Sequence, residues 1–340
     1  MDYATDVLSA LVLLSNYVLI PALTYGSQLA LGALGVTLVF GILRFANFAH
    51  GEMMSFGAMI TIFVTWWFQS VGFTAGVFPT ALLALPIAIA ATALLALGIE
   101  RGVFRFYRLQ KSKPVILVIA SVGVMFVLNG LIRFCISTEE IVFADGQKFL
   151  IKAGAFKKAT GLSQGLALKQ TQVLTIVLAI LAVLALFWFL QRTRTGKAMR
   201  AFSDNEDLAL LSGISPERIV TVTWAIAATL ATLAAVLYSL DKSYSPLLFF
   251  HLLLPVFAAA IVGGIGQPIG AILGGYVVAF SEVIVTYAFK KFLKFLLPAD
   301  FAPDGLVQLL STEYKFAVSF IILVLVLLMR PSGILRGRVL

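Results

Sequence analysis

The residues best suited to chemistry form one short polar segment, Asn47-Phe48-Ala49-His50-Gly51-Glu52, between two long apolar stretches. One histidine and one glutamate are too few for a metal site, because protein metals usually take three or four ligands. Ionisable groups near a membrane interior are costly and often functional, so Asn47, His50 and Glu52 are candidates for a translocation path. The alternative is a polar turn in which Asn47 caps a helix and Glu52 complements its dipole. Physical chemistry alone favours that structural role.

A second candidate is the glycine-rich stretch Gly263-Gly264-Ile265-Gly266-Gln267-Pro268-Ile269-Gly270. Glycine and proline in this pattern break a helix. Broken helices at membrane depth often build a substrate site, in which a half-helix N-terminus faces an anionic group. That interpretation assigns Gly263, Gly264, Gly266 and Pro268 to the path. A tight surface turn followed by small-residue packing through Gly270 and Gly274 explains the pattern equally well.

The third candidate is the polar segment 192–218. Ser203 with Glu206 three residues later is typical of a capping box and predicts a short helix over 204–211 that stops at Gly213. Ser215 and Pro216 then predict the start of the next long helix. The exposed leucines expected on the short helix, Leu208, Leu210 and Leu211, favour docking into a partner's groove over a plain connecting loop.

Other catalytic and nucleotide-binding patterns are absent from the sequence. Gly196-Lys197 is followed by Ala198 and lacks the rest of a phosphate-binding loop, so no ATP site is expected. The spacing of Gly264, Gly266 and Gly270 does not fit a dinucleotide fingerprint. The single cysteine excludes an internal disulfide. We therefore expect no enzyme, no resident metal and no cofactor.

Composition places these segments in a membrane. Of the 340 residues, 61% are hydrophobic and 12% are charged, with a mean hydropathy of +1.02. Soluble domains are about 45–50% apolar and about 25% charged. The net charge of +9 comes from basic residues that flank apolar runs, which indicates topology rather than nucleic-acid binding. Lipid is therefore the expected solvent.

The apolar runs predict an all-α polytopic membrane protein with a single domain over residues 1–340. A spanning helix needs about 20 apolar residues. About eight stretches qualify, with a shorter piece at 252–262 that predicts either a half-helix or a short span before the glycine-rich break. The eight stretches are 17–43, 53–71, 77–99, 115–136, 173–190, 219–240, 268–289 and 316–329.

The distribution of Lys and Arg predicts the orientation. More than half of the 25 basic residues fall in one set of connections, which includes 101–113 and 192–218. Positive charge marks the cytoplasmic side of short loops. The N-terminus is then expected outside and the C-terminus in the cytoplasm. This requires the piece at 252–262 to cross, or nearly cross, the membrane.

Taken together in this order, the segments resemble the LivH-type inner-membrane permease of bacterial branched-chain amino acid ABC importers. The matching stretches are Val39-Phe40-Gly41-Ile42-Leu43 running into Asn47–Glu52, Gly196-x-x-x-Arg200-Ala201 with Asp207-Leu208-Ala209 and Leu211-Ser212-Gly213-Ile214, Val262-Gly263-Gly264-Ile265-Gly266, Leu310-Ser311-Thr312-Glu313-Tyr314-Lys315, and Arg330-Pro331-Ser332-Gly333-Ile334-Leu335.

The resemblance implies a transport subunit of the bacterial inner membrane. Its expected partners are a second homologous permease, two cytoplasmic ATPase subunits, a periplasmic substrate-binding protein and membrane lipid. The segment that couples to the ATPases would match this chain at Gly196, Arg200, Ala201, Asn205, Leu208 and Gly213.

The sequence departs from the family pattern around Pro255 and in the loop 138–170, which bears on the substrate. Permeases for urea, short amides or aromatic acids are therefore alternatives. A stand-alone secondary transporter is a further alternative, but it needs a coupling-ion site, and no predicted span has an Asp or Glu near its centre.

Overall fold

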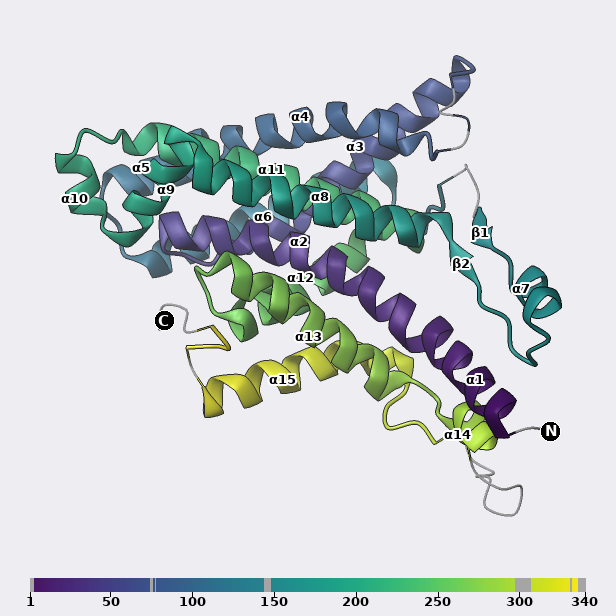
Figure 1. The fold of residues 1–340 in the computed structure, drawn as a ribbon. Helices are drawn as coiled ribbons and strands as arrows, with labels where there is room; N and C mark the ends of the chain where they lie inside the picture. Colours follow the sequence, from purple (N-terminus) through teal and green to yellow (C-terminus); the bar gives the residue numbers. More distant parts are fainter. Residues whose placement is uncertain are drawn as a thin grey trace.

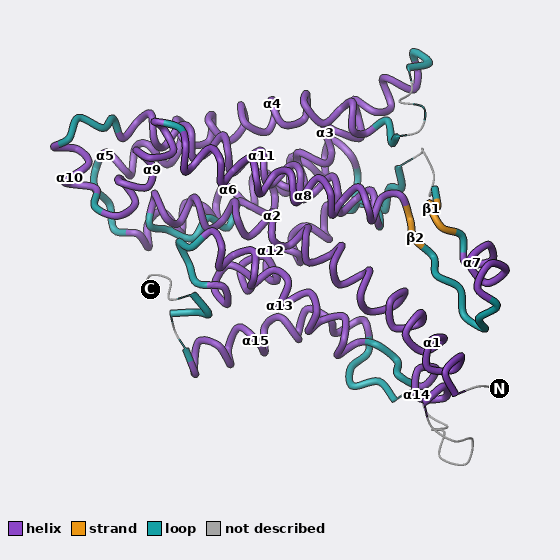
Figure 2. The backbone as a smooth tube through the Cα atoms, in the orientation of Figure 1, coloured by secondary structure: helices purple, strands orange, loops and turns teal. Residues whose placement is uncertain are grey.

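A computed structural model describes residues 3–73, 76, 78–143, 148–296, 307–330 and 332–335. Long helices dominate this part of the chain, as Figures 1 and 2 show. The long helices are α2 (Ile20–Leu43), α3 (His50–Ser70), α4 (Ala81–Ile99), α6 (Pro114–Ile136), α8 (Gln170–Arg192), α11 (Pro216–Asp241), α12 (Pro246–Gly263), α13 (Pro268–Thr286) and α15 (Lys315–Met329).

Shorter helices gather at the two ends of the bundle in Figure 1. One end carries α5 (Arg105–Leu109), α9 (Arg194–Asp204) and α10 (Glu206–Leu211), and we call it the α9–α10 end. The opposite end carries α1 (Tyr3–Leu14), α7 (Ala153–Thr160) and α14 (Lys290–Leu296), and we call it the α7–α14 end. The described chain therefore begins at one end, and α15 finishes toward the other.

The first helix is longer than its apolar run predicts. It continues from α1 through a π-helical turn, η1 (Ser15–Leu19), into α2. Proline lacks the N–H that an α-helix needs at every interior position, and Pro21 falls just after this turn. The N–H of Ile20 accordingly donates to the carbonyl of Ser15, five residues back. The turn keeps the helix continuous around the proline.

Within the described residues, eight helices are long and apolar enough to cross a membrane, which confirms the predicted class. The short piece predicted at 252–262 is part of α12, an 18-residue helix that meets the same criterion, which agrees with the short-span alternative and not with a half-helix. Pro246 starts this helix early, at its first turn, and Pro255 is tolerated inside it. The predicted span 53–71 corresponds to α3, whose 21 residues pack against α4, α6 and α11 but which is not one of the eight.

The little strand structure in the described residues lies in the connection between α6 and α8. Strands β1 (Phe149–Ile151) and β2 (Leu168–Lys169) pair antiparallel and flank α7. Ile141 in the same connection pairs with Tyr244, which brings this connection against the turn between α11 and α12.

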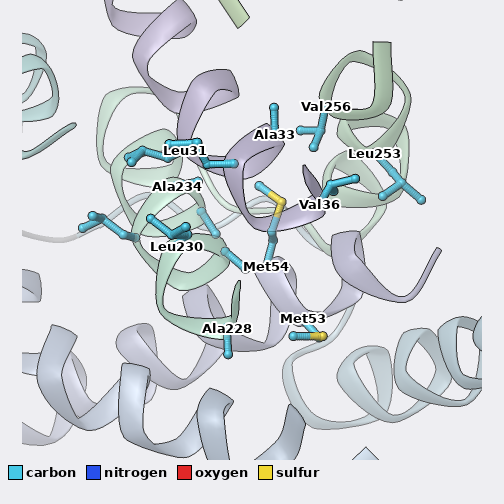
Figure 3. Packing of buried hydrophobic residues seen from close by; sticks show 14 of the residues in the cluster. Leu31, Ala33, Val36, Met53, Met54, Ala228, Leu230, Ala234, Leu253 and Val256 are labelled. Atoms are coloured by element: carbon cyan, nitrogen blue, oxygen red, sulfur yellow. The ribbon is translucent and has the colours of Figure 1, made fainter. Parts of the chain in front are cut away.

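The core forms around α2, which packs against α11, α12, α13 and α8. Small residues permit close approach: a Cβ placed on Gly275 of α13 would lie 2.7 Å from the backbone nitrogen of Ala30 in α2. Such small-residue contacts are the usual basis of helix association in lipid, since lipid removes the hydrophobic driving force between helices. Figure 3 shows the surrounding apolar layer, with labelled residues Leu31, Ala33, Val36, Met53, Met54, Ala228, Leu230, Ala234, Leu253 and Val256.

We predict that Gly275→Val lowers the thermal unfolding midpoint of the purified subunit, because the new side chain meets the α2 backbone. Overpacking of this kind costs about 1–3 kcal/mol. The matched control is Gly98→Val in α4, where a Cβ meets no atom within 4 Å. Unfolding followed by tryptophan fluorescence in detergent measures both variants, and equal midpoints for the two would contradict the close contact.

Candidate functional site

The polar segment 192–218 forms two short helices rather than the one predicted. Thr193 caps α9, since its Oγ1 accepts the N–H of Gly196 at 3.0 Å. Asn205 has an extended φ of −150° that ends α9, and its Oδ1 accepts the N–H of Leu208 at 3.0 Å to start α10. The predicted cap at Ser203 is wrong, because Ser203 lies inside α9 and donates to the carbonyl of Gly41 at 3.0 Å.

The end of this segment follows the prediction. Gly213 has a φ of +80°, a conformation that glycine adopts without strain, and its N–H donates to the carbonyl of Leu210. The N–H of Ile214 donates to the carbonyl of Ala209, and α11 then begins with Pro216 at its first turn. The predicted stop at Gly213 and start at Pro216 are both confirmed.

The segment is firmly attached to the bundle but presents apolar side chains outward. Gly196 is buried, and a Cβ there would lie 2.6 Å from the Cα of Leu190 in α8. Arg44, at the end of α2, donates from Nη2 to the carbonyl of Ser203 at 2.8 Å. Arg200 and Ala201 are exposed on α9, and Leu208 and Leu211 of α10 are 61% and 87% exposed. A rigid, partly apolar projection therefore stands at the α9–α10 end.

The glycine-rich break joins α12 to α13 beside this projection. Gly264 and Gly266 have φ values of 111° and 83°, and Pro268 occupies the first turn of α13. Because α12 and α13 both have the length of a span, the break lies at the end of the bundle rather than at mid-depth. Gly266 and Pro268 line a cavity of about 330 Å³ together with Arg200 and Met199 of α9.

Backbone contacts close much of the break. The N–H groups of Ile334 and Leu335 donate to the carbonyls of Val262 and Gly263 at 2.9 and 3.2 Å. A Cβ on Gly263 would also collide with the backbone of Gly270, so the two helices touch directly at these glycines. These contacts favour the packing explanation for Gly263 and Gly264, while Gly266 and Pro268 still face a cavity. The role of all four in a path stays a prediction.

The Asn47–Glu52 segment lies inside the protein. Asn47 Oδ1 accepts the N–H of Ala49 at 3.1 Å, and the N–H of Phe48 donates to Ser121 of α6 at 3.1 Å. Glu52 Oε1 accepts from Asn129 of α6 at 2.8 Å. Asn47, Glu52 and His50 are each at most 1% exposed. The segment thus joins α3 to α6, and its role in a path stays a prediction.

A neighbouring polar contact lies at the turn between α11 and α12. The hydroxyl groups of Tyr244 and Ser55 are 3.1 Å apart, and Tyr244 is fully buried. Burial raises the pKa of the Tyr244 phenol above its ordinary value, so the group keeps its proton. It therefore contributes a neutral hydrogen bond between this turn and α3.

Sequence reasoning missed a charged cluster near the α7–α14 end. A cavity of about 80 Å³ is lined by Tyr25 of α2, Asp241 and Lys242 at the end of α11, Glu282 of α13 and Lys315 of α15. Glu282 is only 2% exposed and accepts a hydrogen bond from Ser319. In the sequence, Asp241, Lys242 and Lys315 look like ordinary helix-end charges, and only packing of four helices brings them together with Tyr25 and Glu282. The one available signal was Glu282, an acid inside the apolar run of α13.

Comparison with known proteins gives a consistent result. The family model described as "Branched-chain amino acid transport system / permease component" matches residues 18–327. The chain is 30% identical to the high-affinity branched-chain amino acid transport system permease protein LivH of Escherichia coli, over 93% of each chain. It is 31% identical to the permease protein BraD of Pseudomonas aeruginosa, over 94% of this chain and 95% of that protein. The probable branched-chain amino acid transport permease protein LivH of Methanocaldococcus jannaschii is 27% identical, over 92% of this chain and 90% of that protein. Comparison with solved structures found no significant match.

We predict that Asn205→Ala loosens α10, because it removes the acceptor for the N–H of Leu208. Loss of such a cap costs about 1 kcal/mol, or roughly a fivefold rise in local opening. Hydrogen exchange of the peptide covering 206–212, measured by mass spectrometry, should rise accordingly. Asn205→Asp keeps the acceptor and serves as the control. Unchanged exchange in the alanine variant would mean that the cap does not hold the helix.

Proposed function

The chain belongs to the family of branched-chain amino acid transport system permease components, and from that premise we propose that it is the membrane-spanning subunit of an ATP-driven importer of branched-chain or related hydrophobic amino acids. The observation that carries this proposal is the match over 93% of both chains to a permease of that transport system. The eight helices suited to a bilayer agree with it. Transport is then its role, and hydrolysis of ATP belongs to partner subunits.

The α9–α10 projection is the proposed contact with the cytoplasmic ATPase subunits. Its backbone is held by Gly196 and by the Arg44–Ser203 hydrogen bond, so a force on it reaches α2 and α8. Its exposed Leu208 and Leu211 are suited to a groove on a partner. This assignment makes the α9–α10 end cytoplasmic and the beginning of α1 extracytoplasmic. The concentration of Arg and Lys in 101–113 and 192–218 supports it.

The remaining partners follow from the same proposal. A second homologous permease completes the membrane part, and a substrate-binding protein delivers the amino acid at the α7–α14 end. The cavity beside Gly266, Pro268 and Arg200 is the proposed release point on the cytoplasmic side, since it opens next to the projection. Glu52 and the backbone N–H of Phe48 hold α3 against α6 in this scheme, and Asn47, His50 and Glu52 remain the proposed polar residues of the path.

The function is tested by uptake into proteoliposomes that hold the subunit together with the second permease, the ATPases and the binding protein from its own gene neighbourhood. We expect radiolabelled leucine, isoleucine and valine to accumulate only when ATP is supplied. Uptake of urea, short amides or aromatic acids in place of these amino acids would move the substrate to another class. Uptake without the ATPase subunits would refute the importer assignment.

We predict that Leu211→Glu uncouples the importer, because it places a charge on the side chain proposed to enter the ATPase groove. Burial of an unpaired charge costs several kcal/mol, so transport should fall by about tenfold or more. Leu211→Met keeps the apolar contact, and Gln110→Glu adds the same charge to a different exposed position at the same end. Transport and retention of the ATPase subunits during purification are measured for all three. Normal retention and transport in Leu211→Glu would exclude this contact.

A further inference from the structure

Two cavities at the α7–α14 end meet along one face of the first helix. The larger, of about 470 Å³, and the smaller, of about 80 Å³, share Val283 and Thr286 of α13 in their walls. The first helix contributes one residue every four positions to these walls. Leu13 and Tyr17 line the larger cavity, and Pro21 and Tyr25 line the smaller one. The two cavities therefore form one groove between the first helix and α13, which leads from the end of the molecule to the charged cluster.

The two lysines of the cluster are held by aromatic rings rather than by carboxylates. Lys242 Nζ lies 4.8 Å from the centroids of both Tyr25 and Tyr238. Lys315 Nζ lies 5.8 Å from the Tyr25 centroid and 4.6 Å from that of Phe316. Within the described part of the chain, neither ammonium group has a carboxylate oxygen within 4.0 Å. Two positive charges thus flank the ring of Tyr25 without a direct ion pair.

The carboxylates of the cluster also have unused capacity. Glu282 Oε1 accepts from Ser319 and the Tyr25 hydroxyl lies against the same carboxylate, but among the described residues no geometrically ideal donor reaches the buried Glu282 Oε2. Asp241 Oδ1 is likewise buried and without a hydrogen bond to the described part of the chain. Leaving a buried polar atom unpaired is unfavourable, and more so when the atom is charged. All these groups line one small cavity, so a single bound group with both a positive and a negative end can satisfy them together.

We propose that this cluster binds the zwitterionic head of an α-amino acid, with the substrate carboxylate between Lys242 and Lys315 and the substrate ammonium against Glu282 and Asp241. The inference rests on the proposed function and adds the residues that recognise the substrate on the membrane subunit. The larger cavity receives the aliphatic side chain against its apolar wall of Leu13, Val283 and the ring of Tyr17, and Lys290, Lys291 and Gln308 also line this cavity.

A purely structural cluster is the alternative. Charges from α2, α11, α13 and α15 can hold these four helices together without binding anything. Buried ion clusters often add little stability, because desolvation offsets their mutual attraction. The two explanations differ in one respect: only a binding site changes its accessibility when an amino acid is added.

A cysteine reporter makes that distinction in the assembled complex. The chain has one cysteine, so Cys135→Ser gives a cysteine-free background into which Thr286→Cys is introduced at the junction of the two cavities. We expect leucine at ten times its Kd to slow modification of this cysteine by a charged thiol reagent about tenfold. Leu309→Cys, at a residue that is 75% exposed and lines neither cavity, should react at the same rate with and without leucine. Equal rates at both positions would overturn the proposal.

Substrate analogues then assign the two charges. Leucinamide keeps the ammonium but lacks the carboxylate, and 4-methylpentanoate keeps the carboxylate but lacks the ammonium. Glu282→Gln should weaken protection by leucine about tenfold or more and leave protection by 4-methylpentanoate unchanged, because a charge-assisted hydrogen bond is lost only with the ammonium. Lys242→Gln should weaken leucine and leave leucinamide unchanged. Equal weakening of every ligand by both variants would contradict a head-group site.

Failure of this inference and failure of the function give different results. An importer that accumulates leucine while Thr286→Cys is never protected retains its function and has no head-group site in the cluster. An importer that accumulates no amino acid but carries another solute refutes both. Loss of assembly in the Glu282→Gln complex, together with unprotected Thr286→Cys in the parent complex, supports the structural alternative.

Discussion

Direct backbone contact between α2 and its neighbours is the constraint on which the rest of the protein depends. Lipid offers no hydrophobic gain for bringing two helices together, so close van der Waals contact must hold them. Gly275 of α13 meets Ala30, and Gly35 of α2 meets the ring of His50, where an added Cβ would lie 2.6 Å from His50 Cε1. Larger side chains at these glycines would push α13 and α3 away from the central helix.

The central position of α2 connects the two ends of the molecule. Near its C-terminus, Arg44 and Gly41 bond to Ser203 of α9, the helix proposed to contact the ATPases. Near its N-terminus, Tyr25 lies beneath both lysines of the charged cluster. One continuous helix therefore joins the proposed coupling surface to the proposed head-group site. Transmission of a structural change between two distant sites requires a rigid element of this kind. The quantity to measure is the equilibrium between the two arrangements that α2 adopts relative to its neighbours.

One detail of the prediction failed because of a contact between distant helices. The capping pattern predicted a helix start at Ser203, but Ser203 lies inside α9 and donates to the carbonyl of Gly41 of α2, so Asn205 caps α10 instead. No local pattern contains that contact. The extent of α12 is by contrast a local matter, since Pro246 occupies its first turn and the helix ends at Gly263.

The sequence by itself determined the solvent, the helical class and the stops and starts at Gly213, Pro216 and Pro268. These depend on composition and on the backbone preferences of single residues, which are local properties. Only the tertiary structure decided which polar residues meet. Glu282 and Lys315 are separated by 33 positions, and Tyr25 lies more than 250 positions before Glu282. A site assembled from four helices has no signature in any one of them, because the distances between its charges exist only after the helices have packed.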